Sequence, residues 1–160
     1  LGKERKILDN FYIEKSAKLF QEGYNCAQSV FAAFAPLYGM DEKFALKLAS
    51  SFGAGIGRMR EVCGTVSAMS MLASLENGNI DPNDTAAKQA NYELVRQFAN
   101  EFQKENKTII CKELLGLKKA EKSARPSDRT KEYYKERPCL SVVKSAASIL
   151  TKYYEEREKI

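Results

Sequence analysis

The chain is organised around one stretch, Phe52-Gly-Ala-Gly-Ile-Gly-Arg-Met-Arg-Glu-Val-Cys63-Gly-Thr-Val-Ser-Ala-Met-Ser-Met-Leu-Ala-Ser-Leu75. Three glycines at alternate positions open it, and glycine adopts positive φ angles or approaches other groups closely at little cost. The small and apolar residues that follow recur at helical spacing, which predicts a helix beginning near Glu61. Cys63 then lies in the first turn, where free N–H groups, the helix dipole and the nearby Arg58 and Arg60 favour a thiolate. We therefore expect Cys63 to be the most reactive thiol.

The rest of the chain also has the pattern of helices. Asn25 and Gln28 have the spacing of a capping box, and Asp41 is the expected N-cap of the next helix. Asp81-Pro82 or Asp84 is expected to begin a long helix that ends near Asn106. Apolar spacing predicts that three helices bury the following faces: Phe11, Tyr12 and Leu19 in the first, Phe44, Leu48 and Phe52 in the third, and Tyr92, Val95, Phe98 and Phe102 in the long one.

Two further helices are expected near the C-terminus. Thr108 can cap a short segment over residues 109–115, and Pro138 suits the first position of the last helix. The polar, aperiodic segment over residues 117–131 is expected to be an exposed charged loop. No strand competes with these helices, so the fold class is all-α. We expect residues 1–160 to form a single compact bundle of about six main helices.

Composition limits the chemistry that the chain can perform. Among its 160 residues there is no histidine, which removes the usual general base and the commonest zinc ligand. Soft-metal or redox chemistry must therefore use the four cysteines. No apolar run is long enough to span a membrane and no secretory leader is recognisable, so we expect a cytoplasmic protein without membrane insertion.

Each of the four cysteines is predicted to lie in the first turn of a helix, at Cys26, Cys63, Cys111 and Cys139. If those helix starts converge, several thiolates would be stabilised in one place, which suits a metal ion, an iron–sulfur cluster or a disulfide. The alternatives are buried structural thiols, which are common, and structural disulfides, which are rare in the cytosol. Closely spaced cysteine pairs, which usually accompany zinc and iron–sulfur sites, are absent from this sequence.

The glycine run has two interpretations. Glycine loops before helices cradle phosphates, but a dinucleotide fingerprint needs a preceding strand, and a P-loop would end in Gly-Lys-Ser or Gly-Lys-Thr. We favour close helix packing around an open site. Gly53, Gly55, Gly57 and Arg58 are therefore the residues expected to border a bound group.

The positive charge is concentrated between Lys104 and Arg137, with eleven Lys and Arg against six Asp and Glu. Such a segment can bind nucleic acid, and binding would then depend steeply on salt. Acidic residues are interspersed throughout, however, and no nucleic-acid motif accompanies them. We therefore interpret the segment as a solvated loop.

These residues resemble the redox-active proteins of the C_GCAxxG_C_C family, which is named for four cysteines and a Cys-Gly-Ala-x-x-Gly element. Gly23-Tyr-Asn-Cys26 is similar to the first cysteine segment, and Gly53 to Gly64 is similar to the loop that leads to the signature. Cys111-Lys-Glu-Leu-Leu-Gly and Pro138-Cys139 are similar to the third and fourth segments. The signature reads Cys-Gly-Thr-Val-Ser-Ala from Cys63, with threonine and alanine in place of its alanine and last glycine.

The resemblance implies a helical protein in which four thiols act together in a redox role. We expect Cys63 and Cys26 to be the catalytic pair, with Cys111 and Cys139 completing a site for thiol–disulfide exchange or for a metal ion or iron–sulfur cluster held by all four. The partner would be a redox protein or a small molecule, and the chain could form a homo-oligomer. The competing hypothesis is a helical domain that binds a small molecule or a protein and has structural buried cysteines.

Overall fold

The computed structural model describes the backbone of residues 2–119 and 121–160, and the side chains of these residues from Asn10 onward. Leu1 and Ala120, which belong to the predicted domain and loop, lie outside the described residues. The described chain is all-α, with eight helices and no strand. The helices are α1 (Gly2–Gln21), α2 (Cys26–Phe34), α3 (Glu42–Ala49), α4 (Gly64–Asn77), α5 (Thr85–Asn106), α6 (Cys111–Leu114), α7 (Lys131–Glu136) and α8 (Cys139–Glu156).

Helix α2 lies at the centre of the fold and packs against α1, α3, α4 and α8. Its sequence, CAQSVFAAF, is apolar on almost every side, and all of its residues except Cys26 and Gln28 are buried. A helix without a polar face has to be enclosed by its neighbours. The capping box predicted at its start is present, with Asn25 accepting from the Gln28 backbone N–H and the Gln28 side chain accepting from the Asn25 N–H.

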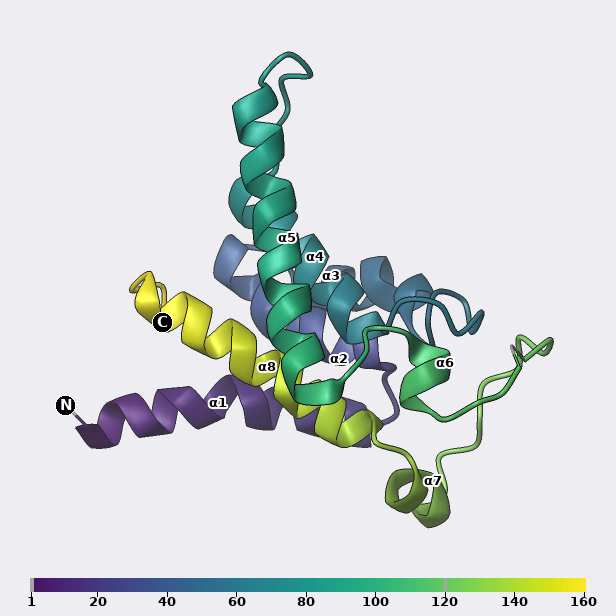
Figure 1. The fold of residues 1–160 in the computed structure, drawn as a ribbon. Helices are drawn as coiled ribbons and strands as arrows, with labels where there is room; N and C mark the ends of the chain where they lie inside the picture. Colours follow the sequence, from purple (N-terminus) through teal and green to yellow (C-terminus); the bar gives the residue numbers. More distant parts are fainter. Residues whose placement is uncertain (1, 120) are drawn as a thin grey trace.

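Four of the other helices form two antiparallel pairs (Figure 1). Helices α1 and α8 run side by side, whereas α4 and α5 form a hairpin that extends away from the rest of the molecule. Helices α6 and α7 and the segment between them gather near the end where α8 begins. None of the helices in the described part of the chain is long and apolar enough to cross a membrane.

Six helices have eight or more residues, which confirms the predicted number of main helices. Asp41 and Asp84 cap α3 and α5 as predicted. Helix α4, however, begins at Gly64 rather than near Glu61, and Cys63 is its N-cap. The helix predicted over residues 109–115 is limited to α6, Pro138 precedes α8 as its N-cap, and α7 was not predicted.

Several predicted buried faces are wrong. In α3 the buried residues are Ala45 and Ala49, whereas Phe44 and Leu48 are exposed. The helix packs closely against α2 through its small residues, and only a small side chain fits such a contact. Phe11 and Tyr92 are exposed as well, although Leu19, Phe98 and Phe102 are buried as expected.

Replacing Phe34 tests the central position of α2. Phe34 is fully buried, and its ring stacks on Tyr12 and Tyr154, with centroids 4.9 Å and 5.6 Å away. We expect Phe34→Ala to lower the free energy of unfolding by about 3–5 kcal/mol, measured by urea denaturation followed by circular dichroism. Phe44→Ala is the matched control, since its ring is 57% exposed, and it should change stability by no more than about 0.5 kcal/mol. Equal losses in both variants would contradict the described packing.

Candidate functional site

All four cysteines line one cavity of about 400 Å³, although they are far apart in the sequence. Cys26, Cys111 and Cys139 are the first residues of α2, α6 and α8, and Cys63 immediately precedes α4. The four helix starts therefore converge on one space. Of the residues expected to border a bound group, Gly53, Gly57 and Arg58 line the cavity, whereas Gly55 does not.

Backbone pairing brings the Cys63 and Cys111 segments together. The Cys63 N–H donates to the Ile109 carbonyl at 2.8 Å, and the Cys111 N–H donates to the Glu61 carbonyl at 2.6 Å. Val62 and Ile110 form an isolated antiparallel bridge between them. Two helix starts distant in sequence are thereby fixed beside each other by main-chain hydrogen bonds, which do not depend on side-chain identity.

The glycine run forms a left-handed turn. Residues 54–58 all have positive φ angles, including the non-glycine residues Ala54, Ile56 and Arg58. Each non-glycine residue in this conformation costs about 1–2 kcal/mol. Hydrogen bonds within the loop hold the turn, such as Gly57 N–H to the Ser51 carbonyl at 2.8 Å. The turn places Ala54 and Arg58 on the wall of the cavity.

Cys26 has the environment of a thiolate. Its sulfur accepts a hydrogen bond from the Cys63 thiol and further bonds from the backbone N–H groups of Ala54, Gly64 and Ala27. These contacts outweigh the opposing effect of burial and lower the pKa of Cys26 to about 6. The side chain is half-buried and faces the cavity. Cys26 can therefore be ionised and accessible at neutral pH.

Gly64 is required for the contact between α2 and α4. A Cβ at this position would lie 2.6 Å from the Cys26 sulfur and 2.9 Å from the Phe52 carbonyl oxygen. Any larger residue would displace the sulfur from the Gly64 N–H group. The glycine that follows Cys63 in the signature therefore leaves the space that the Cys26 sulfur occupies.

Cys63, which we expected to be the most reactive thiolate, has the opposite environment. Donating its proton to the Cys26 sulfur and burial both raise the pKa of Cys63. As an N-cap it lies outside α4, and the first free N–H of that helix points to Cys26 instead. The Cys63 sulfur also lies 3.2 Å from the Thr65 hydroxyl oxygen. Cys63 is thus a buried thiol in contact with the thiolate.

Cys111 and Cys139 also line the cavity, and both are neutral thiols at neutral pH. Burial raises the pKa of Cys111, and a hydrogen bond from Arg60 at 3.8 Å offsets part of that effect. Burial also raises the pKa of Cys139, to about 11. Neither is ionised at neutral pH.

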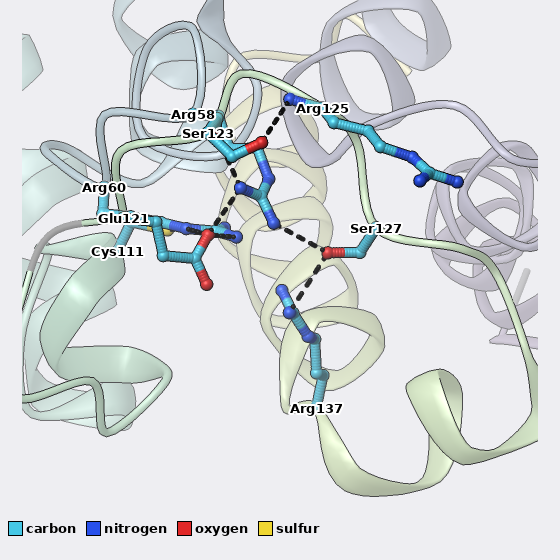
Figure 2. A network of polar contacts seen from close by, with 8 residues as sticks. All are labelled: Arg58, Arg60, Cys111, Glu121, Ser123, Arg125, Ser127 and Arg137. Atoms are coloured by element: carbon cyan, nitrogen blue, oxygen red, sulfur yellow. Dashed lines mark hydrogen bonds and ion pairs between the residues drawn. The ribbon is translucent and has the colours of Figure 1, made fainter.

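A network of arginines holds the segment between α6 and α7 beside the cavity (Figure 2). The Glu121 carboxylate lies 2.8 Å from both Arg58 and Arg60, and Arg60 is almost fully buried. Arg58 also donates to the Ser123 carbonyl at 2.7 Å and to the Ser127 hydroxyl at 3.2 Å. The guanidiniums expected to activate Cys63 therefore bind this segment and Cys111 instead.

Sequence reasoning missed the contribution of this segment to the site. Ser127, Arg129, Tyr133 and Arg137 all line the cavity, and Glu121 anchors the segment. Their signal in the sequence was the excess of basic residues between Lys104 and Arg137, which we interpreted as a solvated loop. Most of residues 117–131 that the structure describes are exposed, but Glu121, Ser127 and Arg129 are half-buried.

The arrangement does not fit the predicted four-thiolate metal or iron–sulfur centre. Such a site needs its ligands within bonding distance of one ion or cluster. Among the described side chains, which are those of residues 10–119 and 121–160, no three from His, Cys, Asp or Glu are placed to hold one metal ion. The sulfurs are arranged instead as a contacting pair, Cys26 and Cys63, with two further thiols on the same cavity wall.

Comparison with known proteins gives one match. Residues 24–153 match the family model described as "Putative redox-active protein (C_GCAxxG_C_C)". No curated protein and no solved structure matches the chain significantly. The matched region contains all four cysteines and the whole cavity wall except Phe20.

The rate of alkylation against pH tests the assignment of the thiolate. We expect iodoacetamide to modify Cys26 with a midpoint near pH 6, and Cys139 only at alkaline pH, because their pKa values are about 6 and about 11. Peptide mass spectrometry identifies each site. Cys63→Ala removes a hydrogen bond to the thiolate, so the Cys26 midpoint should rise, whereas the control Cys111→Ala should leave it unchanged. A Cys26 midpoint near the free-thiol value of about 8.5 would contradict the assignment.

Proposed function

We propose that this chain, which belongs to the C_GCAxxG_C_C family, carries out thiol–disulfide exchange with Cys26 as the attacking thiolate and Cys63 as the resolving thiol. The observation that carries the proposal is that both cysteines line one cavity, with the Cys26 sulfur against Gly64 at the start of α4 and Cys63 as the residue immediately before that glycine. Hydrogen bonding between the two side chains lowers the pKa of Cys26 and raises that of Cys63. Attack on a disulfide requires a thiolate, and an attacking thiol is most effective when its pKa is near the ambient pH. Cys26 meets both requirements and faces the cavity.

The reaction would have two steps. The Cys26 thiolate attacks one sulfur of a substrate disulfide, forms a mixed disulfide and releases the other half of the substrate as a thiolate. Cys63 then loses its proton to that leaving group or to solvent, attacks the Cys26 sulfur and releases the second half. The Cys26–Cys63 pair is oxidised to a disulfide with loss of two electrons, and the substrate disulfide is reduced to two thiols. The reverse sequence oxidises thiols.

The two sulfurs differ in access as these steps require. Cys26 is half-buried on the cavity wall, so a substrate sulfur can reach it, whereas Cys63 is only 5% exposed. A buried second thiol in contact with the first can resolve the mixed disulfide but is shielded from other reagents. The raised pKa values of Cys111 and Cys139 make them slower nucleophiles at neutral pH. We therefore assign the first attack to Cys26.

A reducing compartment suits such a pair, because the disulfide must be reduced again after each turnover. On that ground we propose a cytoplasmic location and a separate dithiol reductant as redox partner.

The competing hypothesis is a small-molecule-binding domain with structural cysteines, and the cavity of about 400 Å³ is the observation in its favour. Cavities of this size bind small ligands in many proteins. Replacing the cysteines distinguishes the two hypotheses.

The proposed pair predicts a reversible disulfide between Cys26 and Cys63. Oxidation of the reduced protein with an excess of a small disulfide should remove two hydrogens from its mass and link the two peptides, and a dithiol should restore it. In Cys63→Ala the reaction should stop at a mixed disulfide on Cys26. Cys111→Ala and Cys139→Ala are the controls and should still form the link.

Two results would count against the proposal. One is a link that forms equally well without Cys63. The other is a Cys26→Ala variant that retains all of the reaction with the small disulfide at neutral pH, because the remaining thiols would then be the reactive ones.

A further inference from the structure

The wall of the cysteine cavity is strongly cationic. Four arginines line it, Arg58, Arg60, Arg129 and Arg137, and no Asp, Glu or Lys is among the described residues that do so. Two negative groups accompany these cations: the Glu121 carboxylate, which pairs with Arg58 and Arg60, and the Cys26 thiolate, which lines the same cavity. The guanidiniums therefore outnumber the anions, and positive charge remains in a space beside the reactive sulfur.

The unmatched charges belong to Arg129 and Arg137. Neither forms an ion pair with any residue that the structure describes. Arg129 donates to the Phe20 and Tyr24 carbonyls at 2.9 Å and 3.0 Å, which are neutral acceptors. These bonds hold Arg129 in place and use N–H groups of both terminal nitrogens. Its guanidinium therefore adds positive charge to the cavity but is not free to bind a carboxylate in the bidentate way.

Arg137 has donors left for a ligand. Within the described chain its guanidinium makes one hydrogen bond, to the Ser127 hydroxyl at 3.3 Å, and it stacks over the Tyr133 ring at 4.8 Å. Stacking fixes the plane of the guanidinium, and its remaining N–H groups can bind a carboxylate in the bidentate way that arginine favours. Figure 2 shows that Arg137, which lies between the end of α7 and the start of α8, extends toward Ser127 and Arg58.

The remainder of the wall is mostly apolar. Leu114, Leu115, Pro126, Pro138 and Val142 contribute to it. The volume of about 400 Å³ is that of a small-ligand pocket. The segment between α6 and α7, held by the contacts of Arg58 with Glu121 and Ser123, adds Ala124, Pro126, Ser127 and Arg129 to this wall, so the space beside Cys26 has the size of a small molecule.

We infer that this cavity binds a low-molecular-weight disulfide that carries carboxylate groups, with Arg137 contacting a carboxylate, Arg129 adding attraction at longer range and Cys26 meeting the disulfide sulfur. The inference rests on the proposed thiol–disulfide exchange and names its substrate class. Exchange reduces the bound disulfide to two thiols, each keeping its carboxylate, while Cys26 and Cys63 lose the two electrons. The positive charge of the cavity attracts an anionic disulfide. A small thiolate free in solution would instead repel it, because both carry negative charge.

The test compares three small disulfides of different charge: dithiodiglycolate, which has two carboxylates, bis(2-hydroxyethyl) disulfide, which is neutral, and cystamine, which is cationic. The rate of each with the reduced protein at neutral pH is divided by its rate with a small reference thiol, which removes intrinsic reactivity. We expect this ratio to be at least about tenfold higher for dithiodiglycolate than for the neutral disulfide, the factor that corresponds to 1.4 kcal/mol. Cystamine should have the lowest ratio.

The variant Arg137→Gln should remove most of the preference for dithiodiglycolate, so that its rate ratio falls close to that of the neutral disulfide. Arg125→Gln is the matched control, because Arg125 lies between α6 and α7, its side chain is 80% exposed and it does not line the cavity. That control loses the same charge and should keep the preference. Arg137→Lys, with circular dichroism of all variants, separates loss of the guanidinium from loss of folding, since the lysine variant should retain part of the preference.

A binding measurement without chemistry separates this inference from the proposed function. Cys26→Ser lacks the proposed attacking thiolate, and calorimetric titration should still detect dithiodiglycolate binding that Arg137→Gln weakens at least about tenfold. Equal ratios for the three disulfides, or equal loss of all three rates in Arg137→Gln, would overturn the substrate class while leaving the exchange reaction intact. If none of the disulfides oxidises the Cys26–Cys63 pair, the proposed function fails, and binding to Cys26→Ser then decides whether the anion site exists on its own.

Discussion

The close approach of the Cys26 sulfur to the Gly64 backbone is the contact on which both fold and site depend. Helix α4 can pack on α2 at this point only because residue 64 has no side chain. The same approach brings N–H groups of two different segments to one sulfur and places the Cys63 thiol against it. Packing and acidity therefore have one cause. A change that loosens this helix contact alters the chemistry as well as the stability.

Local signals in the sequence were sufficient for most of the helices and not for the faces that they bury. The caps at Asn25, Asp41 and Asp84 act between residues three apart, so they can be recognised without knowledge of the fold. The exposed Phe44 shows the limit of such reasoning. Hydrophobicity favours burying the ring, but α3 lies so close to α2 that alanines occupy the contact, and that closeness is a tertiary property.

The sequence was sufficient to predict that the site consists of cysteines at helix starts, but not the role of each cysteine. Four cysteines near four helix starts could be recognised in the sequence, and the structure brings them to one cavity. The left-handed turn over residues 54–58 and the absence of a side chain at Gly64 decide which sulfur receives the free N–H groups. The path of that turn could not be predicted from the sequence. Arg129 and Arg137 reach the cavity through a loop whose composition resembles that of any solvated segment. Arg129 is held by contacts with residues more than a hundred positions away, such as the Phe20 carbonyl, whereas Arg137 contacts Ser127 and Tyr133.

The dependence of Cys26 on residues far along the chain has a consequence for biosynthesis. Helix α2 is made early, but the N–H groups that stabilise its thiolate come from Ala54 and Gly64, and the cavity is completed only by residues near α8. A partly synthesised chain would therefore present Cys26 as an ordinary thiol with the pKa of an unfolded peptide. Non-local contacts of this kind form late in folding, because loop closure must precede them. The reactive sulfur would thus be protected from premature oxidation by the order in which the ribosome delivers its neighbours.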